Sequence, residues 1–510
     1  MLRRKLLMTL VLVVTACGSG WAQAAEDGLD MHMLNRLAFG PSADSVAMLQ
    51  QLGVEGWVNQ QLHPETIAEP RRLTDRLAGL ETQQLDPVTL LERYRPPKDG
   101  DPDARKAARK QMRMVTREAG QAHLLRALYS SRQLQEVMVD FWFNHFNIFA
   151  AKGLDALWIG DYEDKAIRPH VMGRFRDLLE ATARHPAMLF YLDNWQNTAP
   201  GSPGAKGKET GLNENYAREL MELHTLGVDG GYTQDDVIAL ARVLTGWGIV
   251  RPRQARAIGS QDGFAFDENR HDYGDKIFLG HTIHGQGAAE IEQALDILAA
   301  SPATAHHISF ELAQYFVADQ PPPALVERLT RRWMDSKGDI RAVLKDLFAS
   351  PEFRSPATVA AKFKTPFQYV VSATRAADVD VVNFRPLFGA MKRLGQPLYG
   401  CLTPDGYKNT RDAWLNPDAL ALRISFATAL GSGHMPLDRP PPQTDDEEAD
   451  QPVPPPPPEP MRQRPVPLDA DRLAALLGAA LSDKTRDAVN TAPPQLKAAV
   501  VLGSPDFMAH

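Results

Sequence analysis

The pattern that most limits the fold of this 510-residue chain is the spacing of its apolar residues, which recur every three to four positions along most of the sequence. That spacing places them on one face of an α-helix, where they can pack against a core. Thr233 and Asp236 have the spacing of a capping box at the start of one such segment. We expect helices within Gln121–Phe149, Glu163–Ala183, Leu212–Leu226, Gln234–Leu244, Ala289–Ala299, Ala303–Val317, Pro323–Asp335, Ile340–Ala349, Phe363–Ala377 and Pro417–Leu430.

Segments with the composition of β-strands are few. Phe264-Ala265-Phe266 and Lys276-Ile277-Phe278-Leu279 flank a polar turn, and we expect them to pair as one hairpin. The sequence therefore predicts a mainly α fold, in which one large multi-helix domain carries a small β-hairpin excursion near residues 264–279.

The composition changes sharply between residues 433 and 467. This stretch holds 13 of the 39 prolines of the chain, together with the acidic run Asp445–Asp450. It cannot bury enough apolar surface to offset the entropy of ordering, so we expect a disordered, Pro-rich acidic linker. The linker follows a main helical domain, residues 27–432, and precedes a C-terminal helical tail, residues 468–510, which we expect to pack on the main domain.

The first 24 residues have the composition of a signal peptide. A charged start precedes an apolar stretch over residues 6–16, which is too short to span a membrane. Ala22-Gln23-Ala24 forms a cleavage site before Ala25, while Val14-Thr15-Ala16-Cys17 resembles a lipobox that would leave a lipidated Cys17. Both routes stay open, and either one predicts an exported protein that is periplasmic or lipid-anchored to the bacterial envelope.

Charge and cysteine content exclude several classes of protein. The net charge is −7, and removal of the three cations Arg3, Arg4 and Lys5 with the signal peptide would make it −10, which argues against a nucleic-acid partner. No later segment is long and apolar enough to span a membrane, so we expect membrane contact only through the signal peptide or a lipidated Cys17. Two cysteines cannot build a multi-cysteine metal site, and we expect Cys401 to be buried and unpaired.

The densest polar cluster of the sequence lies on the predicted helix of residues 213–224. One side of that helix carries a polar set that consists of Asn215, Arg218, Glu219 and Glu222. One interpretation is a cleft-facing site, in which Arg218 keeps one carboxylate ionised and the other carboxylate acts as an acid, a base or a metal ligand. The other interpretation is the solvated face of an amphipathic helix.

Two histidines complete the candidate site. His145 lies in an aromatic segment, and His224 follows Glu222 by two residues. A lone histidine on an apolar face is more often a hydrogen-bonded core residue than a ligand, and a regular helix cannot bring Glu219, Glu222 and His224 to one metal ion. The sequence therefore assigns no metal or cofactor. The chain also lacks the G-x-S-x-G, H-E-x-x-H, Walker A and G-x-G-x-x-G signatures.

A series of motifs in a fixed order runs along nearly the whole mature chain. The most specific is residues 213–228, and the others include Leu34–Pro41, Phe141–Phe146, Phe175–Leu179, Tyr191–Asn194, Tyr232–Val237, Leu244–Trp247, His271-Asp272, Phe278–Gly280 and Trp414–Pro417. In these motifs the chain resembles the bacterial exported family catalogued as domain of unknown function 1800. That family brings no established activity, cofactor or catalytic residue to this sequence.

The resemblance implies an exported, mainly helical protein with a protein partner. Genes of this family often neighbour genes of a second exported family, domain of unknown function 1501, which implies that the two proteins work together. The sequence departs from the family pattern at Phe143, where a histidine is expected, so a metal site built on paired histidines beside Trp142 loses a ligand. The Pro-rich insert of residues 433–467 is also particular to this chain.

The family motif also changes the interpretation of the polar helix. A solvated face needs no fixed order of residues, yet the motif specifies the polar set that consists of Asn215, Arg218, Glu219 and Glu222. A buried ion-pair network then competes on equal terms with a true site.

Two functions follow from this sequence. The first is a non-enzymatic envelope scaffold or partner-binding protein that works with the second exported protein. The alternative is a hydrolase-type enzyme whose polar centre lies on the helix of residues 213–224, with His145 and His224 nearby. A cleft that brings Glu219 or Glu222 within reach of His145 or His271 would favour the enzyme.

Overall fold

Several helices begin where the sequence supplies a side chain that caps the unpaired backbone amides of the first turn. Helix α11 (Gln234–Val243) starts with the predicted capping box, because Thr233 accepts from the amide of Asp236 and Asp236 accepts from the amide of Thr233. Helix α5 (Pro102–Tyr129) starts at Asp101, whose carboxylate accepts from the amide three residues later. Local side-chain chemistry therefore fixes where these helices start.

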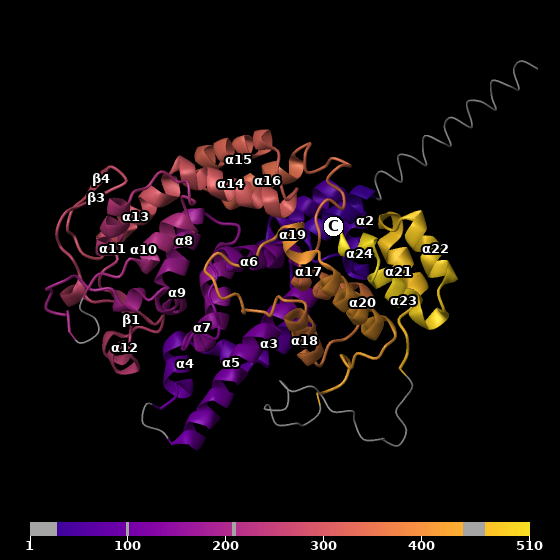
Figure 1. The fold of residues 1–510 in the computed structure, drawn as a ribbon, viewed down its shortest axis with the longest axis horizontal. Helices are drawn as coiled ribbons and strands as arrows, with labels where there is room; N and C mark the ends of the chain where they lie inside the picture. The colour runs from indigo at the N-terminus through magenta and orange to yellow at the C-terminus, as the bar shows by residue number, and fades with distance from the viewer. Residues whose placement is uncertain (1–27, 98–100, 207–210, 442–464) are drawn as a thin grey trace, which may run out of the picture.

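The computed structural model describes residues 28–97, 101–206, 211–441 and 465–510 (Figure 1). Residues 28–37 are helical. The next helices, besides α5 and α11, are α2 (Ala43–Gln61), α3 (Arg71–Ala78), α4 (Pro87–Tyr94), α6 (Gln133–His145), α7 (Asp155–Asp161), α8 (Phe175–Arg184), α9 (Pro186–Tyr191), α10 (Asn215–Glu222) and α12 (Pro252–Ile258). The remaining helices are α13 (Ala289–Ala300), α14 (Pro302–Phe316), α15 (Pro323–Ser336), α16 (Ile340–Ala349), α17 (Pro366–Ala377), α18 (Arg385–Arg393), α19 (Arg411–Trp414), α20 (Pro417–Gly431), α21 (Ala470–Leu477), α22 (Asp483–Thr491), α23 (Lys497–Leu502) and α24 (Pro505–Met508).

The chain makes one circuit of the molecule in the view of Figure 1. From α5 at the lower centre it passes through α6 to α9, occupies the left side with α10 to α13, crosses the top with α14 to α16 and returns on the right with α17 to α24. The C-terminus ends near α2, and the ring of His510 makes a hydrogen bond of 3.0 Å with the backbone oxygen of Asn35. The two ends of the described chain thus meet.

The β structure of the described residues consists of two small antiparallel pairs. Strand β1 (Trp247–Ile249) pairs with β2 (Phe264–Phe266), and β3 (Lys276–Phe278) pairs with β4 (His281–Ile283). The tight turn between β3 and β4 is made at residues 279 and 280, both of which have positive φ, as a two-residue hairpin turn requires. The mainly α fold with a small β excursion is confirmed, but the predicted pairing of the 264–266 and 276–279 segments with each other is wrong.

Two of the long predicted helices are interrupted. The segment 121–149 is divided between α5 and α6, since the chain turns at residues 130–132, where Ser130 accepts from the amide of Arg132. The segment 163–183 is not one helix either. It contains a π-helix, η3 (Tyr162–Ile167), a 3₁₀ turn that includes Pro169, and then α8. Proline has no backbone N–H to continue the ladder, which explains the break after the π-helix.

One hydrophobic core extends from Met33 to Met508 and includes residues of nearly every helix. Helix α5 packs against α7 and α17, and α20 packs against α23 of the C-terminal tail. The tail also adds a β-bridge to the main body, because the backbone of Lys362 and that of His510 exchange two hydrogen bonds of 3.0 and 2.9 Å. Cys401 is buried and unpaired, as predicted.

Several predictions concern residues outside the described ranges. The signal peptide, both cleavage sites and Cys17 lie within residues 1–27, and most of the predicted linker lies within residues 442–464. Near its described start, Leu437 is buried, and its backbone oxygen accepts from the amides of Val382 and Asn383 at 2.7 and 2.9 Å. In the described part of the chain, no helix is long and apolar enough to cross a lipid bilayer.

We predict that the tail is needed for the stability of the main domain. Phe507 is 2% exposed and packs edge-on against Tyr369, with ring centroids 6.0 Å apart. Phe507→Ala should lower the free energy of unfolding by about 3–5 kcal/mol, because it leaves a cavity in the core. Leu496→Ala, at a position that is 37% exposed, should change it by about 1 kcal/mol or less. Urea denaturation monitored by circular dichroism measures both, and equal effects would contradict the prediction.

Candidate functional site

Helix α10 carries the predicted polar set and is shorter than the predicted segment 212–226. It begins after Asn213, whose side-chain oxygen accepts from the amide of Asn215, and it ends at Glu222. The side-chain amide of Asn215 donates to the backbone oxygen of Leu192 at 3.1 Å, so Asn215 joins the helix to the chain after α9. His224 lies beyond the end of the helix, so the geometry of a regular helix no longer applies to it.

Arg218 does not hold either of the two carboxylates with which it was predicted to act. Its guanidinium lies 3.3 Å from Glu214 and donates to Gln234 at 2.9 Å, and Gln234 in turn donates to Glu214 at 2.8 Å. These three side chains form a closed network that joins α10 to α11. About 40% of the Arg218 side chain is exposed, so the network lies at the surface and contributes little to stability.

Glu219 and Glu222 are neighbouring carboxylates that form no ion pair with a Lys or Arg side chain of the described residues. Burial, and then the nearby charge of Glu222, raise the pKa of the Glu219 carboxyl above its usual value. Glu222 accepts a hydrogen bond of 3.2 Å from the hydroxyl of Tyr232. Of the predicted polar set, Glu219 is therefore the residue whose protonation is shifted toward the neutral acid.

The structure brings the two predicted histidines together at the end of α6. The rings of His145 and His224 are 6.1 Å apart, and Nε2 of His145 lies 3.2 Å from the backbone oxygen of His224. On its other side, Nδ1 of His145 lies 2.7 Å from a carboxylate oxygen of Glu311, and His307 stands one helical turn before Glu311 on α14. Sequence analysis missed this pair, although its i, i+4 spacing on a predicted helix was a usable signal.

The contacts of this histidine cluster favour a structural role. Both ring nitrogens of His145 face acceptors, so a protonated ring can donate to both and has no nitrogen left for a substrate. Burial, followed by the charges of His145 and His307, holds the pKa of His224 well below its usual value. The described part of the chain contains no group of three or more His, Cys, Asp or Glu side chains arranged to hold a metal ion.

His271 belongs to a separate closed network. Its Nε2 lies 2.9 Å from a carboxylate oxygen of Glu290, and its Nδ1 lies 2.8 Å from the backbone oxygen of Thr245. Lys276 also donates to Glu290, and all three side chains of this His–Glu–Lys group are fully buried. Their other partners are nearby backbone groups and the side chains of Thr245 and Asp272. Among the described residues, neither His145 nor His271 makes a hydrogen bond or an ion pair with Glu219 or Glu222.

A larger buried network centres on Arg168. Its guanidinium donates to both carboxylate oxygens of Glu136 on α6 at 2.5 and 2.6 Å, and to Glu163 at 2.9 Å. The second oxygen of Glu163 accepts from His123 of α5 at 2.8 Å and from the hydroxyl of Tyr399 at 2.7 Å. Burial alone would raise the pKa of the Glu163 carboxyl, but His123 and then Arg168 outweigh it, so the pKa is lowered.

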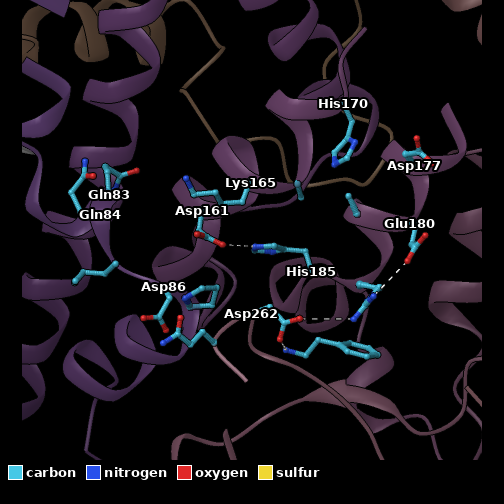
Figure 2. A pocket seen from close by; sticks show the side chains of 17 residues that line it. Gln83, Gln84, Asp86, Asp161, Lys165, His170, Asp177, Glu180, His185 and Asp262 are labelled. Atoms are coloured by element: carbon cyan, nitrogen blue, oxygen red, sulfur yellow. Dashed lines mark hydrogen bonds and ion pairs between the residues drawn. The ribbon is translucent and has the colours of Figure 1, made fainter. Parts of the chain in front are cut away.

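One cavity of the molecule borders the π-helix that carries Glu163. It has a volume of about 660 Å³, which is in the range of ligand-binding pockets, and it lies between the chain before α4, the α7–η3 segment, α8 and the start of β2. Figure 2 shows Gln83 and Gln84 on one side of the view, and Asp177 and Glu180 on the other. We call it the acidic cavity because its lining includes the carboxylates of Asp86, Asp161, Asp177, Glu180 and Asp262.

His185 is the one lining residue with the appearance of a catalytic dyad. Its Nε2 lies 2.9 Å from a carboxylate oxygen of Asp161, as Figure 2 shows. Its Nδ1 accepts from the backbone amide of Ala187 at 3.2 Å, so the ring caps α9 in place of a Ser or Asp side chain. Because one ring nitrogen of His185 donates and the other accepts, these two contacts fix the orientation of the ring beside Asp161.

The cations of the lining neutralise only part of its negative charge. Arg184 lies between Glu180 and Asp262, at 3.5 and 3.9 Å, and its guanidinium stacks 4.7 Å above the ring of Phe264. Lys165, the only other Lys or Arg in the described lining, pairs at 2.9 Å with Asp164, which is outside it. The acidic cavity therefore presents net negative charge to a ligand.

Comparison with known families agrees with the motifs described above. The profile of the family described as "Protein of unknown function (DUF1800)" matches residues 32–509. The chain belongs to this family. No curated protein and no solved structure matches the chain significantly. The DUF1800 match spans α10, the histidine cluster and the acidic cavity, so all of them are parts of the family's domain.

We predict that Glu163 makes the fold of this DUF1800 protein sensitive to acid. Because its pKa is lower in the folded state than its usual value of 4.5, it stabilises the fold above that pH and loses this effect as the pH falls below it. The free energy of unfolding should fall less steeply between pH 5 and pH 3 in Glu163→Gln than in the wild type. Glu65→Gln, at an exposed position, serves as the control and should keep the wild-type slope. An unchanged slope in Glu163→Gln would refute the assignment.

Proposed function

We propose that the protein is an exported, non-enzymatic scaffold of the bacterial envelope that binds a second exported protein through the acidic cavity. The observation that carries this proposal is the excess of carboxylates, five against two cations, around a volume of about 660 Å³. A lysine or arginine side chain of the partner would find several carboxylate acceptors there, and charged hydrogen bonds of this kind are strong and directional.

The polar groups of the cavity support binding more than chemistry. Neither ring nitrogen of His185 is available to take a proton from a substrate, which a general base must do. Among the described residues of the lining there is also no Ser, Thr or Cys that could act as a nucleophile. What remains is a preformed acidic surface whose geometry is fixed by helices.

Export is supported by the start of the sequence, and the identity of the partner by the neighbouring genes of the family. The charged and apolar start of the chain has the composition of a signal peptide, and the mass of the mature N-terminus distinguishes cleavage before Ala25 from a lipidated Cys17. The frequent proximity of genes for the domain of unknown function 1501 family supports a protein of that family as the partner. A basic segment of that protein would be the ligand of the acidic cavity.

We predict that removal of two cavity carboxylates weakens binding of this partner. The double variant Asp177→Asn, Asp262→Asn keeps the shape of both side chains but removes two negative charges. The dissociation constant for the purified partner protein from the same genome should rise by about tenfold, measured by biolayer interferometry. The difference in affinity between the double variant and the wild type should become smaller as salt is added, because salt screens the attraction between the carboxylates and a basic partner.

The matched control removes the same charge elsewhere. Asp75 on α3 and Asp483 on α22 are exposed and lie outside the cavity, so Asp75→Asn, Asp483→Asn should leave the affinity within about twofold of wild type. If both double variants weaken binding equally, the effect comes from net charge and the cavity is not the docking site. If neither does, the proposal fails.

One observation favours the hydrolase alternative, namely the raised pKa of Glu219. A carboxyl with a raised pKa keeps its proton to a higher pH than usual, which suits the role of a general acid. We expect the mature protein to hydrolyse none of a panel of p-nitrophenyl esters and glycosides. An activity that falls about a hundredfold in Glu219→Gln, but persists in Glu214→Gln on the same helix, would replace the scaffold proposal with the enzyme.

A further inference from the structure

A second cavity, of about 820 Å³, lies beside α5. It is formed by α5, residues 150–156 at the start of α7, α18 and residues 397–399. We call it the α5–α18 cavity. Its lining contains no Asp or Glu among the described residues, whereas Arg109, Arg113, Arg117 and Lys392 all belong to it. It thus differs in charge from the acidic cavity and plays no part in the function proposed above.

Helix α5 contributes two neighbouring stripes to this cavity. Arg109, Arg113 and Arg117 recur at every fourth position, so they follow one another along one side of the helix. Met112 and Thr116 are also four residues apart, and each directly precedes one of these arginines in the sequence. They therefore form a second stripe beside the first. The helix presents a cationic edge and, next to it, a surface of apolar and small side chains.

The apolar side of the cavity is completed by other segments of the chain. Phe388 of α18 reaches α5 at Gly120, where a Cβ atom would lie 3.0 Å from the ring, so only glycine allows this approach without a shift. Leu398 lies beside the same glycine, at 3.4 Å from that position, and Leu154 adds a further aliphatic side chain. Together with Met112 these residues offer a continuous apolar surface for a chain of methylene groups.

Two arginines of the cationic edge have no anionic partner within the described part of the protein. The side chains of Arg109 and Arg113 are exposed and make no hydrogen bond or ion pair in the described structure. Like charges four residues apart on a helix repel each other, so this arrangement costs stability unless an anion neutralises it. A carboxylate can accept two parallel hydrogen bonds from a guanidinium, which makes it a fitting partner for this edge.

We propose that the α5–α18 cavity binds a long-chain fatty acid. The carboxylate would lie between Arg109 and Arg113, and the acyl chain would lie along Met112, Phe388 and Leu398. A neutral lipid would leave the arginine edge unneutralised, and a cationic amphiphile would be repelled by it. The acidic run of residues 445–450 of this chain could satisfy the arginines, but it has no apolar chain to cover the rest of the cavity.

The test is isothermal titration calorimetry of the full mature chain with dodecanoate below its micellar concentration. We expect dodecanoate to bind at least about tenfold more tightly than octanoate, because four more methylene groups are buried, and dodecyltrimethylammonium to bind at least about tenfold more weakly than dodecanoate. Equal binding of the anionic and cationic amphiphiles, or no binding of dodecanoate, would overturn the proposal.

Variants locate the binding within the protein. Arg109→Glu, Arg113→Glu should weaken dodecanoate at least about tenfold, whereas Arg71→Glu, Arg93→Glu, an equal charge change at exposed positions outside the cavity, should leave it within about twofold. Leu398→Asp provides a second variant that keeps the arginines and removes part of the apolar surface, and it should also weaken dodecanoate. Equal affinity in the first two double variants would overturn the assignment.

A separate variant tests whether the acidic run of residues 445–450 occupies the cavity in place of a fatty acid. In a chain whose acidic run is neutralised by Asp445→Asn, Asp446→Asn, Glu447→Gln and Glu448→Gln, the affinity for dodecanoate should equal that of the wild type. If dodecanoate binds only after this neutralisation, the native occupant is the acidic run, and the fatty-acid proposal is wrong.

Discussion

The positions of both cavities depend on one buried ion network, in which Arg168 bridges Glu136 of α6 and Glu163 of the π-helix. Charges in such a place are costly unless each has a partner, and here His123 and Tyr399 satisfy the remaining oxygen of Glu163. Removal of one member would leave the others unpaired in the core, at a cost of about 3–5 kcal/mol. Because the partners come from four separate segments, the network fixes α5, α6, the π-helix and the 399 region relative to one another.

The segments that carry this network also line the two cavities. Asp161 and Lys165, at the end of α7 and in the π-helix, point into the acidic cavity, as Figure 2 shows. Tyr399, which donates to Glu163 from the opposite side, lines the α5–α18 cavity. A shift of the π-helix would therefore change both linings at once. The buried charges therefore position the segments whose side chains line the cavities and are accessible to a ligand.

Apolar spacing was enough to predict the fold class and most helices, since burial of one helical face depends on sequence periodicity alone. His145 and His224, which the sequence analysis added to one candidate site, have their rings 6.1 Å apart in the structure. Apolar spacing missed the central network because Glu163 and Arg168 are five residues apart, a pair that faces one way in a π-helix but not in an α-helix. It also missed His185, whose partner Asp161 comes from another helix, and long-range contacts of this kind leave no local pattern.

The net charge of the chain conceals a separation of charge that decides what each cavity can bind. An overall excess of acidic residues suggests a uniformly negative surface, yet the arginines of α5 gather at one cavity and the carboxylates around Asp161 at the other. At physiological ionic strength, exposed charges act over roughly 8 Å, so a ligand responds to the lining of its own cavity more than to the total. A basic protein segment and a fatty acid would then be recognised by the same molecule without competing, because each is repelled by the charges that attract the other.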